Sequence, residues 1–317
     1  MRIAILDLGT NTFHLLIADV NDKRETKKIF KSKRSVKLGE GAIHKLRIGT
    51  IPYDRGLKTM RDYAQIIQCN KVDKVFGFAT SAIRSATNGK KFIKEIFRET
   101  GIRIKIISGE REAELIYFGV KQCVQMSDSP SLIMDIGGGS TEFIIANDKK
   151  IFWKHSFNIG AARLLETIKP SDPILPGEIN VLKKYLDKIL MPLDEAVKKI
   201  PVKQLIGSSG SFDTLAEMIG WKFHRKNVIK GIKSYNFNLD EYFRLHTILL
   251  ASTTRQRMKM KGLVKMRVDM IVLSTICTHY VIRKFNFKEM LLSKYALKEG
   301  ALWEAVSGMS VSGSPKF

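Results

Sequence analysis

The chain has 317 residues, 44% of them hydrophobic, which is enough for two cores of ordinary domain size and excludes a disordered or fibrous protein. It carries 54 basic and 31 acidic residues, a formal net charge of +23, so we expect a polyanionic partner. Nucleic acid, polyphosphate, acidic lipid and charged nucleotides all fit that charge, as does plain solubility. Three widely spaced cysteines exclude a disulfide framework and a zinc site. With no signal peptide and no apolar run of about eighteen residues, we expect a cytoplasmic protein without membrane contact.

Apolar runs and helical spacing predict strands that alternate with helices, which is typical of a mixed α/β sheet. In the first part of the chain we predict strands at 2–8, 13–20, 26–33, 72–78 and 102–107, and helices at 53–68, 90–98 and 109–124. A second cycle has strands at 131–135, 140–146, 151–156 and 202–206, and helices at 161–168, 177–199, 212–219, 239–252, 267–285 and 297–305.

These cycles predict an N-terminal domain at 1–124 and a more helical domain at 125–317. The last helix, at about 297–306, can pack back on the first domain. The end of the chain, 309–317, reads as a frayed tail.

Two segments repeat one another at an offset of 128 residues: DLGTNTFHLLIAD at 7–19 and DIGGGSTEFIIAN at 135–147. Each reads as a strand ending in aspartate, a turn rich in glycine and hydroxyl residues, and a returning apolar strand. The repeat predicts two lobes of similar topology that face each other across a central cleft. Chance similarity between two short hairpins is the alternative.

The two turns are predicted to bind phosphate, because glycine lets the backbone approach a ligand closely and successive N–H groups form an anion-binding nest. A single turn of this kind also serves as an ordinary hairpin, whereas two of them favour phosphate. The predicted phosphate-binding residues are Gly9, Thr10, Asn11 and Thr12 in the first turn, and Gly137, Gly138, Gly139, Ser140 and Thr141 in the second. Asp7 and Asp135, at the turn mouths, are hard ligands suited to Mg2+ or to a metal-bound water.

Three further loops carry glycine or hydroxyl residues. One of them would place Ser208, Ser209, Gly210 and Ser211 at a helix N-terminus, where N–H groups and the helix dipole favour an anion. In the second, residues 79–84, the hydroxyls could cap the next helix, whereas Arg84 could grip a phosphate through a bidentate contact. The third loop, 38–41, is weak evidence for a phosphate site on its own.

Glu112 and Glu142 are the candidate acid–base residues. Glu112 falls on the same side of its helix as Leu115 and Ile116, so it is expected to point toward packed structure. A partly desolvated carboxylate has a raised pKa and can accept a proton from water, although an acid in the first helical turn also stabilises the helix dipole. Glu142 lies in an apolar returning strand, where a charge is costly unless it faces a cleft or a cation. His14, its counterpart in the first repeat, reads as a structural histidine.

Two stretches, 27–37 and 255–267, carry six basic residues each and no acid. They are either solvated faces or a track for a long polyanion. Aromatic residues are not interleaved with them, so nucleic acid binding is not favoured, although it stays open as a side activity.

Taken in order, these motifs resemble the exopolyphosphatase and guanosine pentaphosphate phosphohydrolase (Ppx/GppA) family over nearly the whole chain. The matching segments are 7–15, 38–41, 79–84, 108–113, 135–142 and 159–164. The resemblance implies two ribonuclease-H-like lobes of the actin, acetate kinase and hexokinase superfamily. It further implies that Glu112 activates the attacking water, that Asp135 and Glu142 position metal and water, and that both turns, with Arg84, hold the terminal phosphates. Mg2+ or another divalent cation is the implied cofactor, and dimers are common for such folds.

The sequence departs from the family pattern at three places. Thr10 and Thr12 replace the more frequent serines and keep the hydroxyls, and the serines of 207–211 replace part of a Gly-Thr-Gly-Gly-Thr loop and lose backbone freedom. The additional C-terminal helical domain of long members is missing, which favours the short two-domain form and puts processivity on long chains in doubt.

We therefore expect metal-assisted water attack that releases terminal orthophosphate from inorganic polyphosphate or guanosine pentaphosphate, with the charge favouring polyphosphate. A kinase of the same fold is one alternative, but the sequence shows no signature of an acceptor pocket or an adenine site. A non-catalytic sensor of polyphosphate or of the guanosine alarmone is another, since positive charge is useful for binding alone.

Overall fold

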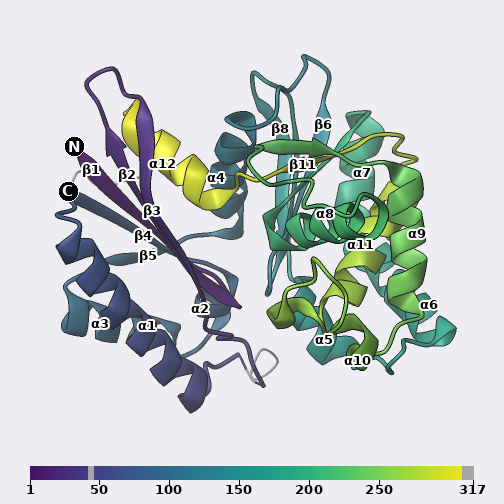
Figure 1. Cartoon of the computed structure of the whole chain (residues 1–317), viewed down its shortest axis with the longest axis horizontal. Coiled ribbons are helices and arrows are strands. Elements are labelled where there is room, and N and C mark those ends of the chain that lie inside the picture. The colour runs from purple at the N-terminus through teal and green to yellow at the C-terminus, as the bar shows by residue number, and fades with distance from the viewer. Residues whose placement is uncertain (42–45, 309–317) are drawn as a thin grey trace. The chain divides into compact units, whose positions relative to one another are not determined.

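The computed structural model describes residues 1–41 and 46–308. The chain forms two compact units, Met1–Gln122 together with Ala296–Phe317, and Cys123–Tyr295 (unit 1 and unit 2; Figure 1). We propose that they correspond to the two predicted domains, with the last helix belonging to the first. Within the described part of the chain, no helix combines the length and the apolar character that crossing a bilayer requires.

Unit 1 is built on a five-stranded sheet in the order β3-β2-β1-β4-β5. β2 is antiparallel to β1 and β3, whereas β4 and β5 run parallel to β1. The strands are β1 (Arg2–Leu8), β2 (Thr12–Val20), β3 (Thr26–Ser35), β4 (Lys74–Ala79) and β5 (Ile104–Ile106). The helices are α1 (Thr50–Cys69), α2 (Ser81–Ser85), α3 (Gly89–Thr100), α4 (Gly109–Lys121) and α12 (Leu297–Ser307).

Successive side chains of β1 lie on opposite faces of the sheet, and those of one face belong to a core cluster of unit 1. Ala4, Leu6 and Leu8 join one core cluster with residues of α1 and α3, such as Met60 and Phe92. Because successive side chains of a strand point to opposite faces, Asp7 projects from the other face of the sheet. Helix α12 contacts β1 and β2 as well, although none of its described residues belongs to this core cluster, and it also packs on α4.

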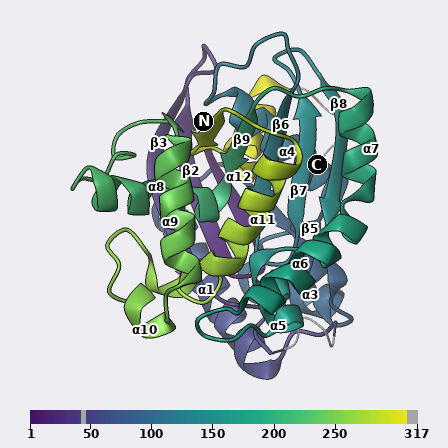
Figure 2. The ribbon, with the colours of Figure 1, turned by 90° about the vertical axis from the view of Figure 1, so that its right-hand side faces the viewer.

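Unit 2 is built on a six-stranded sheet in the order β10-β11-β9-β6-β7-β8. The strands are β6 (Ser131–Ile136), β7 (Thr141–Ala146), β8 (Ile151–Phe157), β9 (Leu205–Ser208), β10 (Ser234–Asn236) and β11 (Met290–Ser293). The helices are α5 (Ala161–Ile168), α6 (Pro176–Ile189), α7 (Met191–Lys199), α8 (Ser209–Phe223), α9 (Leu239–Leu250), α10 (Thr254–Arg257) and α11 (Ile271–Lys284), with a short 3-10 helix at Lys265–Arg267. α9 and α11 lie side by side (Figure 2).

The internal repeat of the sequence is a repeat of the fold. β6 pairs antiparallel with β7 and parallel with β9, as β1 pairs with β2 and β4. The register is also the same, since Asp7 lies opposite His14 and Asp135 lies opposite Glu142. Chance similarity of two hairpins is therefore excluded, and the predicted mixed α/β fold with two halves of similar topology is confirmed.

The structure corrects several predicted elements of unit 2. The prediction of a single helix at 177–199 was wrong. Helix α6 ends at Ile189, and α7 begins at Met191 with Pro192 in its first turn. Proline has no N–H and clashes with the preceding turn, so a helix breaks in front of it. β10, β11 and α10 were not predicted, because runs of three or four residues are too short to show a period. The tail predicted at 309–317 lies outside the described residues.

Helix α12 packs on α4 at a separation that only glycine allows. A β-carbon on Gly300 would lie 1.8 Å from the carbonyl oxygen of Leu115, and one on Gly119 would lie 2.1 Å from that of Ala296. The Arg111 side chain of α4 adds hydrogen bonds to Glu114 and to Glu304 of α12. Helix α12 therefore fixes the position of α4, the helix that carries Glu112.

Candidate functional site

The carboxyl ends of β1, β4 and β5 meet at one edge of the unit 1 sheet, because these strands are parallel. Three of the predicted motifs follow these ends: the turn 9–12, the segment 79–84 and the start of α4. The backbone joins them, since the Thr80 N–H donates to the Leu8 carbonyl at 3.2 Å and the Ile107 N–H donates to the Ala79 carbonyl at 3.1 Å. The fold thus gathers the predicted residues of unit 1 at one place.

The first turn is closed and braced by backbone hydrogen bonds. The Gly9 N–H donates to the Thr12 carbonyl at 3.0 Å. The Asn11 carbonyl accepts from the N–H groups of Val36 and Lys37, both at 2.9 Å. The Thr10 carbonyl accepts from the N–H of Gly39, in the glycine loop 38–41, at 3.4 Å. In a trans peptide the C=O and N–H point in opposite directions. The N–H groups of Asn11 and Thr12, which share peptides with the Thr10 and Asn11 carbonyls, are therefore directed away from residues 36–39.

The triple-glycine turn of unit 2 has the same construction. The Gly137 N–H donates to the Ser140 carbonyl at 3.0 Å, which closes the turn. The Gly137 carbonyl accepts from the Ala161 N–H at 2.9 Å, and the Gly138 carbonyl accepts from the backbone of 162–163 at 2.9 and 3.1 Å.

The third glycine of this turn is held by a side chain, because the Gly139 carbonyl accepts from Arg163 Nε at 2.8 Å. All three glycine carbonyls are thus directed to the start of α5. The N–H groups of Gly138, Gly139 and Ser140 point the other way and donate to no other described residue. Three successive N–H groups with a common direction are suited to an anion.

Gly160 is the contact that lets α5 approach the turn. A β-carbon there would lie 2.5 Å from the carbonyl carbon of Gly138 and from the nitrogens of Gly139 and Ser140. Thr141, a predicted phosphate-binding residue, is buried and donates instead to the Ile159 carbonyl at 3.1 Å. Residues 159–164 thus act as the brace of the turn, a role that sequence reasoning did not assign to them.

Glu112 and Arg84 form an ion pair. The Glu112 side chain points inward and the residue is 8% exposed. Arg84 Nη1 donates to Glu112 Oε2 at 2.9 Å and to the Ile107 carbonyl at 3.0 Å. The sequence suggested separate roles for the two residues. In the structure, the Arg84 guanidinium holds the Glu112 carboxylate in one orientation.

Ser81 is a residue that sequence reasoning missed. It is 2% exposed, and its buried hydroxyl has no hydrogen-bond partner among the described residues. The alternative that hydroxyls cap the next helix is not realised, because the N-cap residue Thr80 makes no side-chain cap. Since an unpaired buried hydroxyl is costly, Ser81 is suited to donate to a ligand at the edge of the unit 1 sheet.

Asp135 and Glu142 lie opposite each other on β6 and β7, which places their β-carbons about 5 Å apart on one face of the sheet. They are 4% and 1% exposed. Asp135 accepts from the hydroxyls of Ser208 at 2.5 Å and Ser209 at 2.7 Å, and Glu142 accepts from the Ser156 hydroxyl at 2.6 Å.

Two neighbouring buried carboxylates repel each other, so a cation beside them is favourable. Mg2+ is commonly held by one or two carboxylates together with substrate phosphates, so this pair fits the implied metal. Asp7 belongs to unit 1, where it lies opposite His14. In residues 1–41 and 46–308 no group of three or more His, Cys, Asp or Glu side chains is arranged around a common point.

The segment in which β9 ends and α8 begins, with the predicted residues 208–211, makes internal contacts. The hydroxyls of Ser208 and Ser209 are used by Asp135, and Ser211 Oγ lies 3.1 Å from Ser274 Oγ. Ser209 has φ of 69°, a left-handed conformation that favours glycine. Serine replaces a more flexible glycine at this kind of position, and here Ser209 is held in its conformation by the hydrogen bond from its hydroxyl to Asp135.

Arg267 covers Gly210 in the first turn of α8. A β-carbon on Gly210 would lie 1.5 Å from Arg267 Nη2, and Arg267 Nη1 donates to Thr214 Oγ1 at 3.0 Å. Burial lowers the pKa of this guanidinium. Arg257 of the same basic stretch is also buried and donates to the Val268 carbonyl. The stretch 255–267 is therefore not a continuous solvated track.

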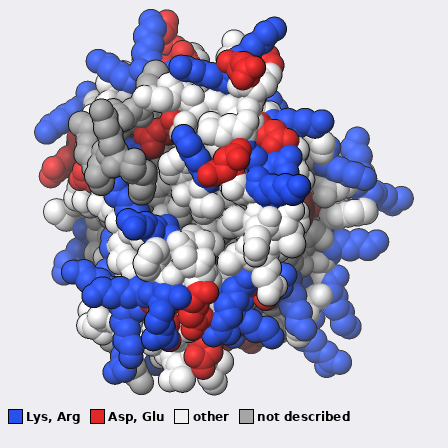
Figure 3. Space-filling model, turned by 90° about the vertical axis from the view of Figure 1, so that its left-hand side faces the viewer, with Lys and Arg blue, Asp and Glu red and all other residues white. Residues whose placement is uncertain are grey.

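Basic side chains are spread widely over the surface. In the face drawn in Figure 3, Lys and Arg surround a mostly uncharged centre, and the acidic side chains are few and scattered. A positively charged surface attracts polyanions over several ångströms, up to the distance at which dissolved salt screens the charge.

Comparisons with known proteins agree on one family. A model of the Ppx/GppA phosphatase family matches residues 16–308. The crystal structure of an exopolyphosphatase from Cytophaga hutchinsonii is 40% identical, with a TM-score of 0.95, and covers 99% of this chain and 100% of its own.

Two curated relatives are more distant. The bifunctional 3-dehydroquinate synthase/phosphatase of Fusobacterium nucleatum is 32% identical over 96% of this chain, which spans 46% of that protein. Exopolyphosphatase 1 of Mycobacterium tuberculosis is 26% identical, and the match covers 95% of this chain and 87% of that protein.

The brace of the triple-glycine turn can be tested by Gly160→Ala. The added methyl group would push the turn out of place, and we expect tripolyphosphate binding, measured by titration calorimetry, to weaken at least about tenfold. Gly177→Ala is the matched control in the same unit, because nothing lies within 4 Å of a β-carbon there. Unchanged affinity in a folded Gly160→Ala protein would contradict the role of the brace.

Proposed function

Because the chain belongs to the Ppx/GppA phosphatase family, we propose that it hydrolyses phosphoanhydride bonds and releases the terminal orthophosphate of inorganic polyphosphate. The observation that carries the proposal is the triple-glycine turn, whose three carbonyls are bound to the start of α5 while its N–H groups point the other way. Donors fixed in advance stabilise charge that develops on phosphate oxygens without reorganising during the reaction.

In the proposed mechanism Glu112 is the general base. Its carboxylate accepts a proton from the attacking water, and Arg84 holds it in place through the 2.9 Å contact. The turns 9–12 and 137–140 hold the phosphate chain through backbone N–H groups. The arginine also brings positive charge close to the base and the anionic substrate.

Asp135 and Glu142 are the proposed metal ligands, and Asp7, in the matching position of the first turn, is proposed for the same role. Mg2+, when bound, would neutralise part of the negative charge on the phosphate oxygens. The serines 208 and 209 fix the orientation of the Asp135 carboxylate through their hydroxyl groups. An oriented carboxylate loses less freedom when it binds a cation.

Polyphosphate is the preferred substrate of the proposal, and guanosine pentaphosphate is the second. The net charge of +23 favours a long polyanion, because each added phosphate adds attraction. The likeness to exopolyphosphatases from two organisms supports the same choice.

The role of Glu112 is tested by Glu112→Gln, with Glu110→Gln as control, since Glu110 is exposed on the same helix. The glutamine cannot accept the proton of water, so we expect phosphate release from tripolyphosphate to fall by about 10²- to 10⁴-fold while binding is retained. Equal rates in the two variants would remove Glu112 from the mechanism. Absence of turnover in the parent protein would instead favour a sensor.

The metal proposal is tested by Asp135→Asn. Removing the charge of one ligand should raise the Mg2+ concentration for half-maximal phosphate release by about tenfold or more. Asp128→Asn is the control, because Asp128 is an exposed acid of the same unit that pairs with Lys149. Direct Mn2+ binding, followed by its electron paramagnetic resonance signal, separates loss of the metal from loss of activity. If both variants titrate alike, the carboxylate pair does not hold the metal.

The substrate is tested by a panel of short polyphosphate, long polyphosphate, guanosine pentaphosphate and ATP, with released orthophosphate measured in the absence of an acceptor. We expect the highest kcat/KM with polyphosphate. Preference for guanosine pentaphosphate would keep the mechanism and reject this substrate. Phosphate transfer that needs an added acceptor would favour a kinase of the same fold.

A further inference from the structure

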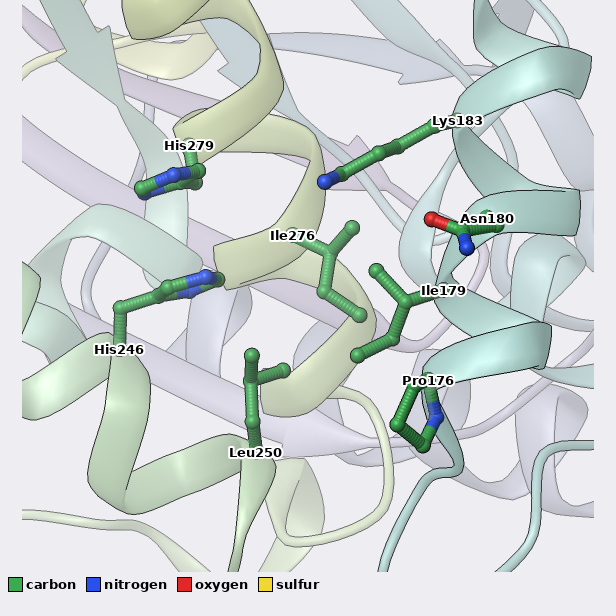
Figure 4. Close-up of a pocket in the computed structure, with 8 residues that line it drawn as sticks. All are labelled: Pro176, Ile179, Asn180, Lys183, His246, Leu250, Ile276 and His279. Carbon is green, nitrogen blue, oxygen red and sulfur yellow. The ribbon is translucent and has the colours of Figure 1, made fainter.

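A pocket of about 240 Å³ lies between α6, α9 and α11 of unit 2 and shares no residue with the turns described above. Figure 4 shows its lining residues, which are Pro176, Ile179, Asn180, Lys183, His246, Leu250, Ile276 and His279. Nothing in the proposed phosphohydrolase mechanism uses these side chains. We therefore consider which ligand these lining residues could bind.

One part of the pocket is apolar. Pro176 and Ile179 of α6, Leu250 of α9 and Ile276 of α11 form this wall. An apolar cavity of about 150 Å³ takes up a benzene molecule, so the pocket is large enough for one aromatic ring and a small polar group. An apolar wall of this kind favours a ligand with a hydrocarbon body over a bare ion.

The other part of the pocket is basic. Lys183 reaches from α6 toward the imidazoles of His246 and His279, whose rings stack at 4.1 Å with an angle of 4° between their planes. Burial is the main cause that lowers the pKa of both imidazoles, and the positive charges of Lys183 and Arg283 act in the same direction, as does the His279 ring on His246. The pKa is about 3 for His246 and about 4 for His279. Both imidazoles are therefore neutral near pH 7, and Lys183 supplies the charge.

The hydrogen-bonding groups of the pocket complement this charge. The buried Nδ1 of His279 has no hydrogen-bond partner among the described residues. A buried N–H without a partner is rarer than a buried acceptor without one, so we assign the proton to Nε2, which makes it a donor. Asn180 adds an amide, and none of the lining residues carries a carboxylate. The pocket therefore offers a cation and donors beside an apolar wall, with no acid to repel an anion.

We propose that this pocket binds a small monocarboxylate whose apolar body is about the size of one aromatic ring. The carboxylate accepts hydrogen bonds from Lys183 Nζ and from the donors beside it. The apolar body lies against Ile179, Leu250 and Ile276. A charge-assisted contact fixes the orientation of the ligand, and the removal of its apolar surface from water supplies most of the affinity.

Benzoate is the probe, titrated by calorimetry into the full chain. Lys183→Gln should weaken its binding by about tenfold, which corresponds to the loss of one charge-assisted hydrogen bond. Lys184→Gln is the matched control, because this lysine is the next residue of α6, is exposed and does not line the pocket. It should leave benzoate affinity unchanged. Both positions are at the surface, and thermal melting checks that both variants fold.

Three further arms can overturn the proposal. Benzyl alcohol, which has the ring without the charge, should bind at least about tenfold more weakly than benzoate. Orthophosphate should not compete with benzoate, and Ile179→Trp, which fills the pocket, should abolish benzoate binding. Equal affinity in the two lysine variants, equal affinity for benzyl alcohol, or competition by orthophosphate would each show that the pocket does not select an apolar carboxylate. Unchanged benzoate binding in a folded Ile179→Trp protein would show that benzoate binds elsewhere.

Discussion

The candidate site depends on the planarity of the trans peptide, in which the C=O and N–H groups point in opposite directions. Wherever the carbonyls of a turn are bound on one side, its N–H groups are directed to the other. In the triple-glycine turn the start of α5 binds all three glycine carbonyls, and in the first turn residues 36–39 bind those of Thr10 and Asn11. A hairpin thereby becomes a rigid donor surface, which an anion needs and a loose loop cannot offer.

Each unit contains one such braced turn, but the side chains around the turn differ between the units. Asp7 faces His14 in the first copy, whereas Asp135 faces Glu142 in the second. The second copy therefore concentrates acid, which suits a cation, and the edge of the first sheet carries the Arg84–Glu112 pair, which suits a base. The same backbone geometry is thus combined with different side chains in the two units.

The sequence could predict the parts of the site that are local. The turns, their aspartates and the inward direction of Glu112 follow from strand alternation and helical spacing within a few residues. The pairing of Arg84 with Glu112 and of Ser208 with Asp135 joins residues 28 and 73 positions apart, and no periodicity reports such contacts. The same limit applies to Arg267 over Gly210. The break before Pro192 was readable in the sequence, but the helical pattern on both sides of it concealed the two separate helices.

The central claim is that backbone N–H groups of the triple-glycine turn hold the anion. Amide resonances of the isotope-labelled protein, followed by nuclear magnetic resonance as tripolyphosphate is added, test it most directly. We predict saturable shifts at the amides of Gly138, Gly139 and Ser140. Shifts confined to the lysines of β3, with the turn amides unmoved at saturation, would contradict it.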